Sequence, residues 1–316
     1  MKVGLVVPQF GINATKENLT EFIQLAEKEG FESLWVYDRM LYPLDPQPPY
    51  PYSGPPDMSE WPEHFKNVLD PLTTLAFIAA NTTKAHLGPC IIDIVFHNPI
   101  TLAKEFTTID ILSGGRVICG FGIGWSKHEF LASNITYEKR GDRTNEILKA
   151  MKKIWTDDIV EFNGEFYKIP KSIIGPKPIQ KPHLKILLGG FSPKTFERMV
   201  KYGDGYIGYI EALVGSFEYI HNSIKMFNIA IEKSSRTRKE FDLTFFTNPR
   251  LLNNSISREK GNRFPMTSET IDEIGSDLSM FKESGVDRVI LGVNAGKDYN
   301  VNETIEFFKE LKKFYQ

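Results

Sequence analysis

The chain has 316 residues, of which 41% are hydrophobic and 25% charged, and its formal net charge is −2. This balance of charge argues against a basic surface for nucleic acid, and no run of apolar residues is long enough to span a membrane. The two cysteines form neither a C-x-x-C motif nor a disulfide framework, and Pro8 breaks the apolar N-terminal run before any cleavage signal. We therefore expect a cytoplasmic protein without a nucleic-acid or membrane partner.

Apolar runs typical of strands alternate along the chain with segments of helical periodicity. Eight strands are expected, near residues 2–8, 33–37, 86–94, 116–121, 184–189, 205–209, 243–247 and 286–292. Eight parallel strands joined by helices close into a β/α barrel, a fold that routinely uses about 250 residues or more. We predict one domain over residues 1–316, a single (β/α)8 TIM barrel.

The predicted helices carry recognisable end signals. The third one begins with Asn98 as N-cap and Pro99 at the first helical position, and it ends at Gly114. The first helix has an apolar stripe at i, i+3, i+4 and i+7 that should face the sheet, made by Leu19, Phe22, Ile23 and Ala26.

Two stretches are longer than ordinary connections, and we interpret both as insertions. Residues 39–69 follow strand two, at the barrel end where active sites lie, and are rich in Pro and aromatic side chains. This composition favours an ordered lid that covers an apolar ligand. A flexible surface loop is the less favoured interpretation. Residues 157–183 lie between strands four and five and contain a hairpin-like segment at 160–167.

Reactive groups in a β/α barrel come from the carboxyl ends of the strands and the loops after them. Asp38 and Arg39 follow strand two, and Asp93 and His97 lie at the end of strand three. A structural ion pair explains Asp38 and Arg39 about as well as ligand contact does. A residue at a helix start explains His97 about as well as a proton donor does. These four residues are the candidates for proton transfer.

The remaining reactive side chains predict no further chemistry. The six histidines show no metal-ligand spacing, so no metal site is expected. Cys90 and Cys119 lie within apolar strands, where a buried thiol is far more common than a nucleophile.

Two glycine-rich segments follow strands four and five. They are Gly120-Phe121-Gly122-Ile123-Gly124 and Gly189-Gly190-Phe191-Ser192-Pro193. Glycines let backbone amides approach an anion closely, and the amides at a helix N-terminus suit a phosphate. The spacing is not that of a Rossmann motif. Tight packing explains either segment alone equally well, but together, on adjacent strands, they favour a phosphate site.

These segments resemble the luciferase-like monooxygenase family, which comprises flavin-dependent monooxygenases and deazaflavin (coenzyme F420) dependent oxidoreductases on a β/α barrel. The resemblance covers most of the chain and is carried by residues 103–116, 120–125, 137–141, 176–178, 189–193 and 203–206. The order of these motifs along the chain makes a chance match implausible.

The resemblance implies roles for particular residues. The loop of Gly122, Ile123 and Gly124 and the loop of Gly189, Gly190, Phe191 and Ser192 look like the family's clamps for the cofactor phosphate, and Trp125 is expected to bind the cofactor as well. Asp38 matches a position near the ring of the cofactor. In the deazaflavin branch a non-proline cis peptide in strand three supports the back of that ring, and by position it is the Cys90–Ile91 bond.

The chain also departs from part of the family. The deazaflavin-dependent sugar-phosphate dehydrogenases carry His after the strand-two Asp and Glu at the end of the G-x-G-x segment, where this chain has Arg39 and Trp125. The resemblance therefore favours an apolar substrate, beneath Trp125 and the aromatic loop, over a sugar phosphate.

Three functions follow from the resemblance. The first is hydride transfer between coenzyme F420 and a small, apolar organic substrate. The second is an FMN-dependent monooxygenase with a separate flavin reductase, because the chain shows no nicotinamide motif, and the third is flavin binding without turnover. We favour the first and expect a homodimer. Lys127, Lys194 and Arg198 flank the two loops where the anionic tail of F420 could emerge, although solvated surface positions explain them nearly as well.

Overall fold

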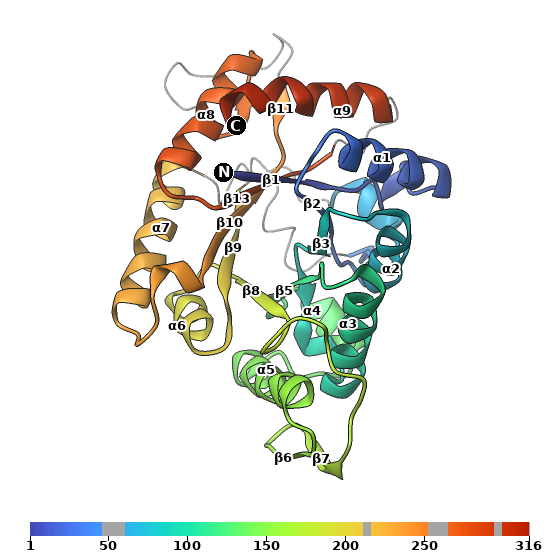
Figure 1. Ribbon diagram of the computed structural model, residues 1–316, viewed down its shortest axis with the longest axis vertical. Coiled ribbons are helices and arrows are strands. Elements are labelled where there is room, and N and C mark those ends of the chain that lie inside the picture. Colours follow the sequence, from blue (N-terminus) through green and yellow to red (C-terminus); the bar gives the residue numbers. More distant parts are fainter. Residues whose placement is uncertain (46–60, 211–215, 252–264, 294–298, 316) are drawn as a thin grey trace.

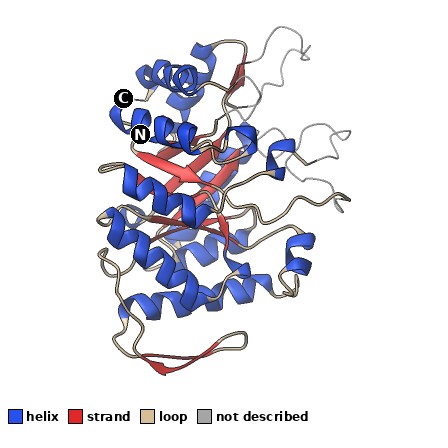
Figure 2. Cartoon of the chain, turned by 90° about the vertical axis from the view of Figure 1, so that its right-hand side faces the viewer, coloured by secondary structure: helices blue, strands red, loops and turns tan. Residues whose placement is uncertain are grey.

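A computed structural model describes residues 1–45, 61–210, 216–251, 265–293 and 299–315. Figure 1 shows most of the strands gathered at the centre of the molecule with the helices arranged around them. Seen from the side in Figure 2, the helices again cover the outside of the strands. Among the described residues no helix is both long and apolar enough to cross a membrane.

The strands of the barrel are all paired in parallel within the part of the chain that the structure describes. Their spatial order is β3 (His86–Pro89), β2 (Ser33–Val36), β1 (Lys2–Val6), β13 (Arg288–Leu291), β10 (Asp242–Thr247), β9 (Gly205–Ile210), β8 (Lys185–Gly189), β5 (Ile118–Gly122) and β4 (Ile92–Asp93). When this order is followed around the ring from β1 through β2 and β3, the strands come in the same order as the eight predicted strands in the sequence. The predicted β/α barrel is therefore confirmed.

The third predicted strand is split into β3 and β4. The Cys90–Ile91 peptide bond between them is cis, as the resemblance implies. β4 pairs with β5, and Leu87 of β3 forms a single parallel bridge with Val117 just before β5. These contacts join the two ends of the sheet, so nine short strands make an eight-stranded barrel.

Helices cover the barrel between successive strands. They are α1 (Lys16–Lys28), α2 (Pro71–Asn81), α3 (Pro99–Ser113), α4 (Lys127–Ala132), α5 (Arg140–Thr156), α6 (Pro193–Tyr202), α7 (Phe217–Glu232), α8 (Ile271–Glu283) and α9 (Val301–Glu310). The end signals of α3 are confirmed: the Asn98 side chain accepts a hydrogen bond from the amide of Ile100, and Gly114 adopts the left-handed conformation that ends the helix.

Short elements complete the chain. The 3₁₀ helices are η1 (Gly11–Asn13), η2 (Glu63–Lys66), η3 (Ile94–Phe96), η4 (Arg238–Glu240) and η5 (Leu311–Phe314). β6 (Val160–Asn163) and β7 (Lys168–Ser172) pair antiparallel outside the barrel, where the sequence predicts a hairpin. β11 (Arg250–Leu251) and β12 (Thr267–Ser268) form a separate pair. The single domain over residues 1–316 stays a prediction.

Trp35 is one of the largest fully buried side chains among the described residues. Its indole nitrogen donates a hydrogen bond to Ser33 Oγ at 2.8 Å. A Cβ atom at Gly4 of the neighbouring strand would overlap the indole, and one at Gly88 would lie 3.1 Å from it. Glycines on both sides of β2 therefore make room for one large aromatic side chain in the barrel.

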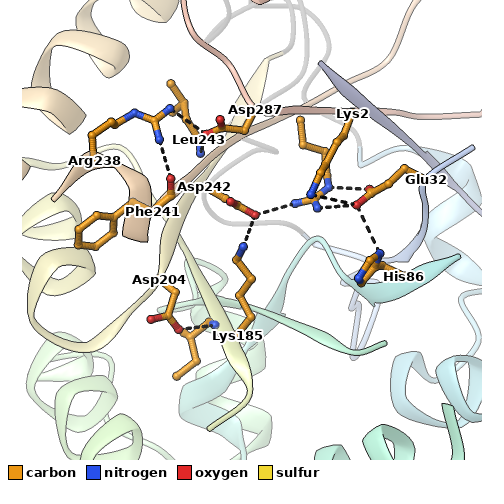
Figure 3. Close-up of polar contacts among 12 residues, drawn as sticks. Lys2, Glu32, His86, Lys185, Asp204, Arg238, Phe241, Asp242, Leu243 and Asp287 are labelled. Carbon is orange, nitrogen blue, oxygen red and sulfur yellow. Dashed lines mark hydrogen bonds and ion pairs between the residues drawn. The ribbon is translucent and has the colours of Figure 1, made fainter. Parts of the chain in front are cut away.

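A layer of ion pairs closes the barrel at the amino ends of the strands, and we call it the amino-end network. Arg288 is buried at its centre, 2.9 Å from Glu32 Oε1 and 3.3 Å from Asp242 Oδ2. Lys185 also pairs with Asp242 at 2.6 Å, and His86 lies 3.4 Å from Glu32 (Figure 3). Each of these residues begins or directly precedes a different strand. The ion pairs can therefore form only when the closed barrel brings the amino ends of these strands together.

Candidate active site

Charged side chains gather at the carboxyl ends of the strands, and we call Asp38, Asp93, Glu129 and Arg39 the carboxyl-end cluster. Arg39 Nη1 lies 2.9 Å from Glu129 Oε1, and both side chains are largely buried. The same Glu129 oxygen accepts a hydrogen bond from the amide of Met40 at 3.0 Å. The structure thus brings together three of the four predicted proton-transfer residues and adds Glu129.

Sequence reasoning missed Glu129. It is the third residue of α4, whose N-cap Ser126 accepts a hydrogen bond from the Glu129 amide. Ser126 and Glu129 form the S-x-x-E pattern of a helix start, which is the one local signal for this residue. Its side chain reaches instead to Arg39, 90 positions away. Glu129 Oε2 is buried and has no hydrogen-bond partner among the described residues.

Asp38 and Asp93 of this cluster have raised pKa values. Burial raises the pKa of Asp38 to about 7, with the negative charges of Asp93 and Glu129 adding to the effect and Arg39 opposing it. Burial and the charge of Glu129 likewise raise the pKa of Asp93 to about 6. Asp38 keeps part of its surface exposed. The cluster can therefore exchange a proton near neutral pH.

Aromatic rings surround the Arg39 guanidinium. Its carbon lies 5.1 Å from the ring centroid of Trp61 and 5.2 Å from those of Phe65 and Trp125. The Trp61 and Trp125 centroids are themselves 5.1 Å apart. The end of the predicted lid thus packs onto the end of strand two. Residues 46–60 lie outside the described residues, so the lid itself stays a prediction.

The structure places His97 apart from these contacts. Its carbonyl accepts a hydrogen bond from the Tyr167 hydroxyl of β7's hairpin loop at 3.5 Å. Burial lowers its pKa, and the charge of Asp70 opposes that shift. Among the described residues no hydrogen bond, ion pair or ring contact joins His97 to the carboxyl-end cluster, so its role as proton donor stays a prediction.

His64, to which the sequence assigned no role, packs beside the cluster's aromatic side chains. Its ring centroid lies 5.0 Å from that of Phe10 and 4.5 Å from that of Phe65. Burial and the charge of Arg250 lower the pKa of His64 to about 4, so the ring is neutral at physiological pH. It therefore contributes an aromatic surface to this region and no positive charge.

The first glycine segment is explained mainly by packing. A Cβ atom at Gly120 would overlap the carbonyl of Pro89, and one at Gly122 would overlap the side chain of Ile91. Gly124 has a φ of 75° and donates its amide hydrogen to Asp93 Oδ1 at 2.9 Å. The Gly124 amide is thus already occupied, and the glycines at 120 and 122 let β5 lie close to the split third strand.

Ile91 follows the cis peptide and lies between glycines of two strands. Its side chain fills the space that a Cβ atom at Gly122 would occupy. A Cβ atom at Gly189 would lie 3.5 Å from the Cγ2 atom of Ile91. The Ile91 side chain is half-buried, whereas Cys90 is buried. Burial raises the pKa of the Cys90 and Cys119 thiols, so neither is a nucleophile at neutral pH.

The second glycine segment lies beside the first, because Phe121 and Leu188 are partners in the pairing of β5 with β8. Ser192 is the N-cap residue of α6, and Pro193 begins that helix. Gly190 has a φ of 139°, and a Cβ there would lie 2.6 Å from Thr195 Oγ1. The loop of Gly189, Gly190, Phe191 and Ser192 therefore opens at the N-terminus of a ten-residue helix.

The three flanking cations differ in exposure. Lys127 and Lys194 are exposed. Arg198 is buried, with its Nε donating to Asn145 Oδ1 at 2.7 Å and its Nη2 to the Gly141 carbonyl. The prediction that Arg198 is available to an anionic tail is wrong, because this side chain fastens α6 to α5. No metal-binding group of His, Cys, Asp or Glu occurs among the described residues.

Comparison with known proteins gives concordant matches in sequence. Residues 1–251 match the family model of luciferase-like monooxygenases. An uncharacterized protein of Mycobacterium tuberculosis is 35% identical over 185 residues, which are 58% of this chain and 64% of that protein. An F420-dependent glucose-6-phosphate dehydrogenase of Amycolatopsis mediterranei is 29% identical over 203 residues, 63% of this chain and 54% of that enzyme. The match spans less than two thirds of either relative.

Solved structures match over almost the whole chain. An F420-dependent secondary alcohol dehydrogenase in complex with an F420-acetone adduct has a TM-score of 0.78 at 20% identity, covering 100% of this chain and 99% of that one. A monooxygenase from Streptomyces bottropensis has a TM-score of 0.76 at 20% identity, covering 99% of both chains. At such identities the likeness shows a shared fold.

Proposed function

Because the chain belongs to the luciferase-like monooxygenase family, we propose that it is a coenzyme F420-dependent oxidoreductase that transfers a hydride between the deazaflavin and a small, apolar organic substrate. Similarity to F420-dependent relatives supports the cofactor. The observation that carries the chemistry is the carboxyl-end cluster, in which Asp38 has a pKa of about 7. The homodimer and the cytoplasmic location expected from the sequence remain proposals.

The residues present fit such a cofactor. Ile91 offers an aliphatic surface flanked by Gly122 and Gly189, which suits the back of a flat ring. The loop of Gly190, Phe191 and Ser192 at the N-terminus of α6 suits a phosphate. Since Asp93 occupies the Gly124 amide, we assign the phosphate to this second loop and the surroundings of the ring to the first.

The chain's own groups would manage the proton. When bound, F420 supplies the hydride chemistry at its deazaflavin ring. We assign Asp38 to hold and release the accompanying proton, because a pKa near 7 keeps both of its protonation states populated at neutral pH. Asp93 and Glu129 favour its protonated form, and Arg39 limits their effect.

The surroundings of Arg39 support an apolar substrate. The guanidinium already pairs with Glu129 at 2.9 Å and lies among the rings of Trp61, Phe65 and Trp125. A sugar phosphate would have to displace Glu129 to bind Arg39, leaving a buried carboxylate without its cation. An uncharged substrate can lie against the exposed parts of Phe65 and Trp125 at no such cost.

Equilibrium binding of F420 and of FMN at matched salt tests the cofactor. We expect F420 to bind more tightly, and FMN binding at least tenfold tighter, about 1.4 kcal/mol, would overturn the proposal. That result would favour the FMN-dependent monooxygenase with a separate reductase, which the family and the structure from Streptomyces bottropensis support.

Turnover tests the reaction. F420 absorbance is followed with a panel of small apolar alcohols, ketones and unsaturated carbonyl compounds, with sugar phosphates as the control substrates. Oxidation or reduction of the cofactor by an apolar member of the panel is the expected result. Tight binding of F420 without turnover of any compound would favour a binding protein, and turnover of sugar phosphates alone would contradict the substrate class.

A further inference from the structure

A chain of buried hydroxyl groups lies behind the proposed phosphate loop. Tyr206 of β9 is fully buried, and its hydroxyl is 3.1 Å from the Gly190 carbonyl and 3.1 Å from the hydroxyl of Tyr219 in α7. The buried Ser223, one turn further along α7, lies beside the two hydroxyls. Burial raises the pKa of both tyrosines, so they are neutral.

The direction of these hydrogen bonds follows from counting protons. A carbonyl only accepts, so the single hydroxyl hydrogen of Tyr206 goes to Gly190. Tyr219 must then donate its own hydrogen to the Tyr206 oxygen. The chain of hydroxyls therefore ends at the Gly190 carbonyl and holds it toward the protein interior.

This carbonyl fixes the direction of the next amide. The Gly190–Phe191 bond is trans, and in a planar trans peptide the C=O and N–H bonds point in opposite directions. With the Gly190 carbonyl directed at Tyr206, the Phe191 N–H is directed away from it. Gly190 permits this orientation because its φ of 139° is rarely open to other residues.

We propose that Tyr206 is a positioning residue for the phosphate loop: its hydroxyl, supported by Tyr219, holds the Gly190–Phe191 peptide with its N–H toward a bound phosphate. The inference rests on the proposed function and adds to it the residues that orient the loop. Tyr206 touches the loop only from behind, so its effect on binding is confined to ligands that carry a phosphate.

The test compares two ligands that share a ring: F420 and its phosphate-free deazaflavin chromophore. Tyr206→Phe keeps the ring that packs 4.8 Å from Phe196 and removes only the hydroxyl. Loss of one neutral hydrogen bond should weaken F420 binding about fivefold to tenfold. Binding of the phosphate-free chromophore should change less than about twofold, since the ring contacts are untouched.

Tyr219→Phe and Tyr202→Phe complete the series. Tyr219→Phe keeps the hydrogen bond from the Tyr206 hydroxyl to the Gly190 carbonyl but removes the hydrogen bond that Tyr219 donates to Tyr206. F420 binding should therefore weaken less than in Tyr206→Phe. The second removes a buried tyrosine hydroxyl at the far end of α6 and should leave both ligands unaffected. Thermal unfolding of each variant verifies that it is folded.

The outcomes separate the inference from the function on which it rests. Unchanged F420 binding in Tyr206→Phe, or equal weakening of both ligands, would overturn the positioning role alone. If the wild-type protein binds FMN and not F420, FMN and riboflavin give the same comparison. A wild-type protein that binds none of these ligands would overturn the proposed function, and the inference with it.

Discussion

The two ends of the barrel use the same kinds of charged side chain in opposite states. At the amino end, burial alone would raise the pKa of Glu32, but the hydrogen bond and the charge of Arg288 outweigh burial and lower it to about 2. At the carboxyl end, burial raises the pKa of Asp38 to about 7 and that of Asp93 to about 6. The same backbone thus supports carboxylates that never protonate at neutral pH and carboxylates that readily do.

The difference lies in the number of cations per carboxylate. The cations Arg288 and Lys2 lie within 4 Å of Glu32, and the cations Lys185 and Arg288 lie that close to Asp242. In the carboxyl-end cluster three carboxylates share Arg39. A surplus of positive partners fixes charge and favours the folded state, whereas a shortage leaves a proton to be exchanged. We therefore expect the amino end to contribute mainly to stability and the carboxyl end to proton transfer.

Asp38→Asn should produce the largest change, and only in activity. Because the amide cannot release a proton, we expect kcat to fall by about 10²–10⁴-fold. Cofactor binding should be retained, and the free energy of unfolding at pH 7 should not decrease, since the variant removes a carboxylate that burial disfavours. Steady-state kinetics and denaturant unfolding measure both effects. A drop in kcat below threefold would show that another group handles the proton.

Arg288→Met should have the complementary effect at the other end. The variant leaves Glu32 and Asp242 partly buried without their shared cation, and breaking such a network costs about 3–5 kcal/mol of the free energy of unfolding. Lys2→Met is the matched control, because Lys2 pairs with the same Glu32 but is 54% exposed, and an exposed pair contributes about 0–1 kcal/mol. Equal losses in urea unfolding of the two variants would contradict the central role of Arg288.

The acid dependence of stability should distinguish the two ends as well. The pKa of Glu32 is lowered from 4.5 to about 2 in the folded state. Its contribution, about 3 kcal/mol, is therefore present above pH 4.5 and lost as the pH falls toward 2. Glu32→Gln should reduce stability at pH 7 and flatten its pH dependence in that window. Asp93→Asn should increase the free energy of unfolding at pH 7, because the raised pKa of Asp93 means that its ionised carboxylate destabilises the folded state. Unfolding curves at pH 3, 5 and 7 decide between these signs.

The fold could be predicted because its signals are local. Each strand leaves an apolar run in the sequence, and α3 carries its N-cap Asn98 and its terminal Gly114 within a few residues of its ends. The parallel pairing then follows from the alternation of strands and helices. The position of the cis peptide came from resemblance, since nothing in the chemistry of Cys90 or Ile91 distinguishes that bond.

The contacts of the site could be predicted only in part, because charge in a sequence says nothing of burial or partner. Arg198 looked like a surface cation, but the fold turns it toward Asn145 in α5. Glu129 finds its partner Arg39 only when α4 lies over the end of β2. The amino-end network has the same origin: Glu32 and Asp242 lie 256 and 46 positions from Arg288 in the sequence and meet it only in the closed barrel.

The smallest expected effect concerns the charges that face Asp38, which are Asp93 of β4, Glu129 of α4 and the adjacent Arg39. Glu129→Gln removes a negative charge, so the pKa of Asp38 should fall and the pH profile of kcat should move to lower pH. Arg39→Met removes the positive charge and should move the profile to higher pH. A shift of about one pH unit, or 1.4 kcal/mol, is expected in each direction.

Opposite shifts are what separate an electrostatic role of this pair from a structural one. Both variants remove the ion pair between Arg39 and Glu129, so a purely structural pair would lower kcat in both without moving the profile in opposite directions. Lys127→Met is the control, because Lys127 is an exposed residue of α4, the helix that also carries Glu129. This variant should leave the pH profile of kcat unchanged. If the Glu129 and Arg39 variants shift the pH profile of kcat in the same direction, the titrating group seen in that profile is not Asp38. In that case Asp93, which contacts the Gly124 amide and responds to the same two charges, becomes the group to replace next.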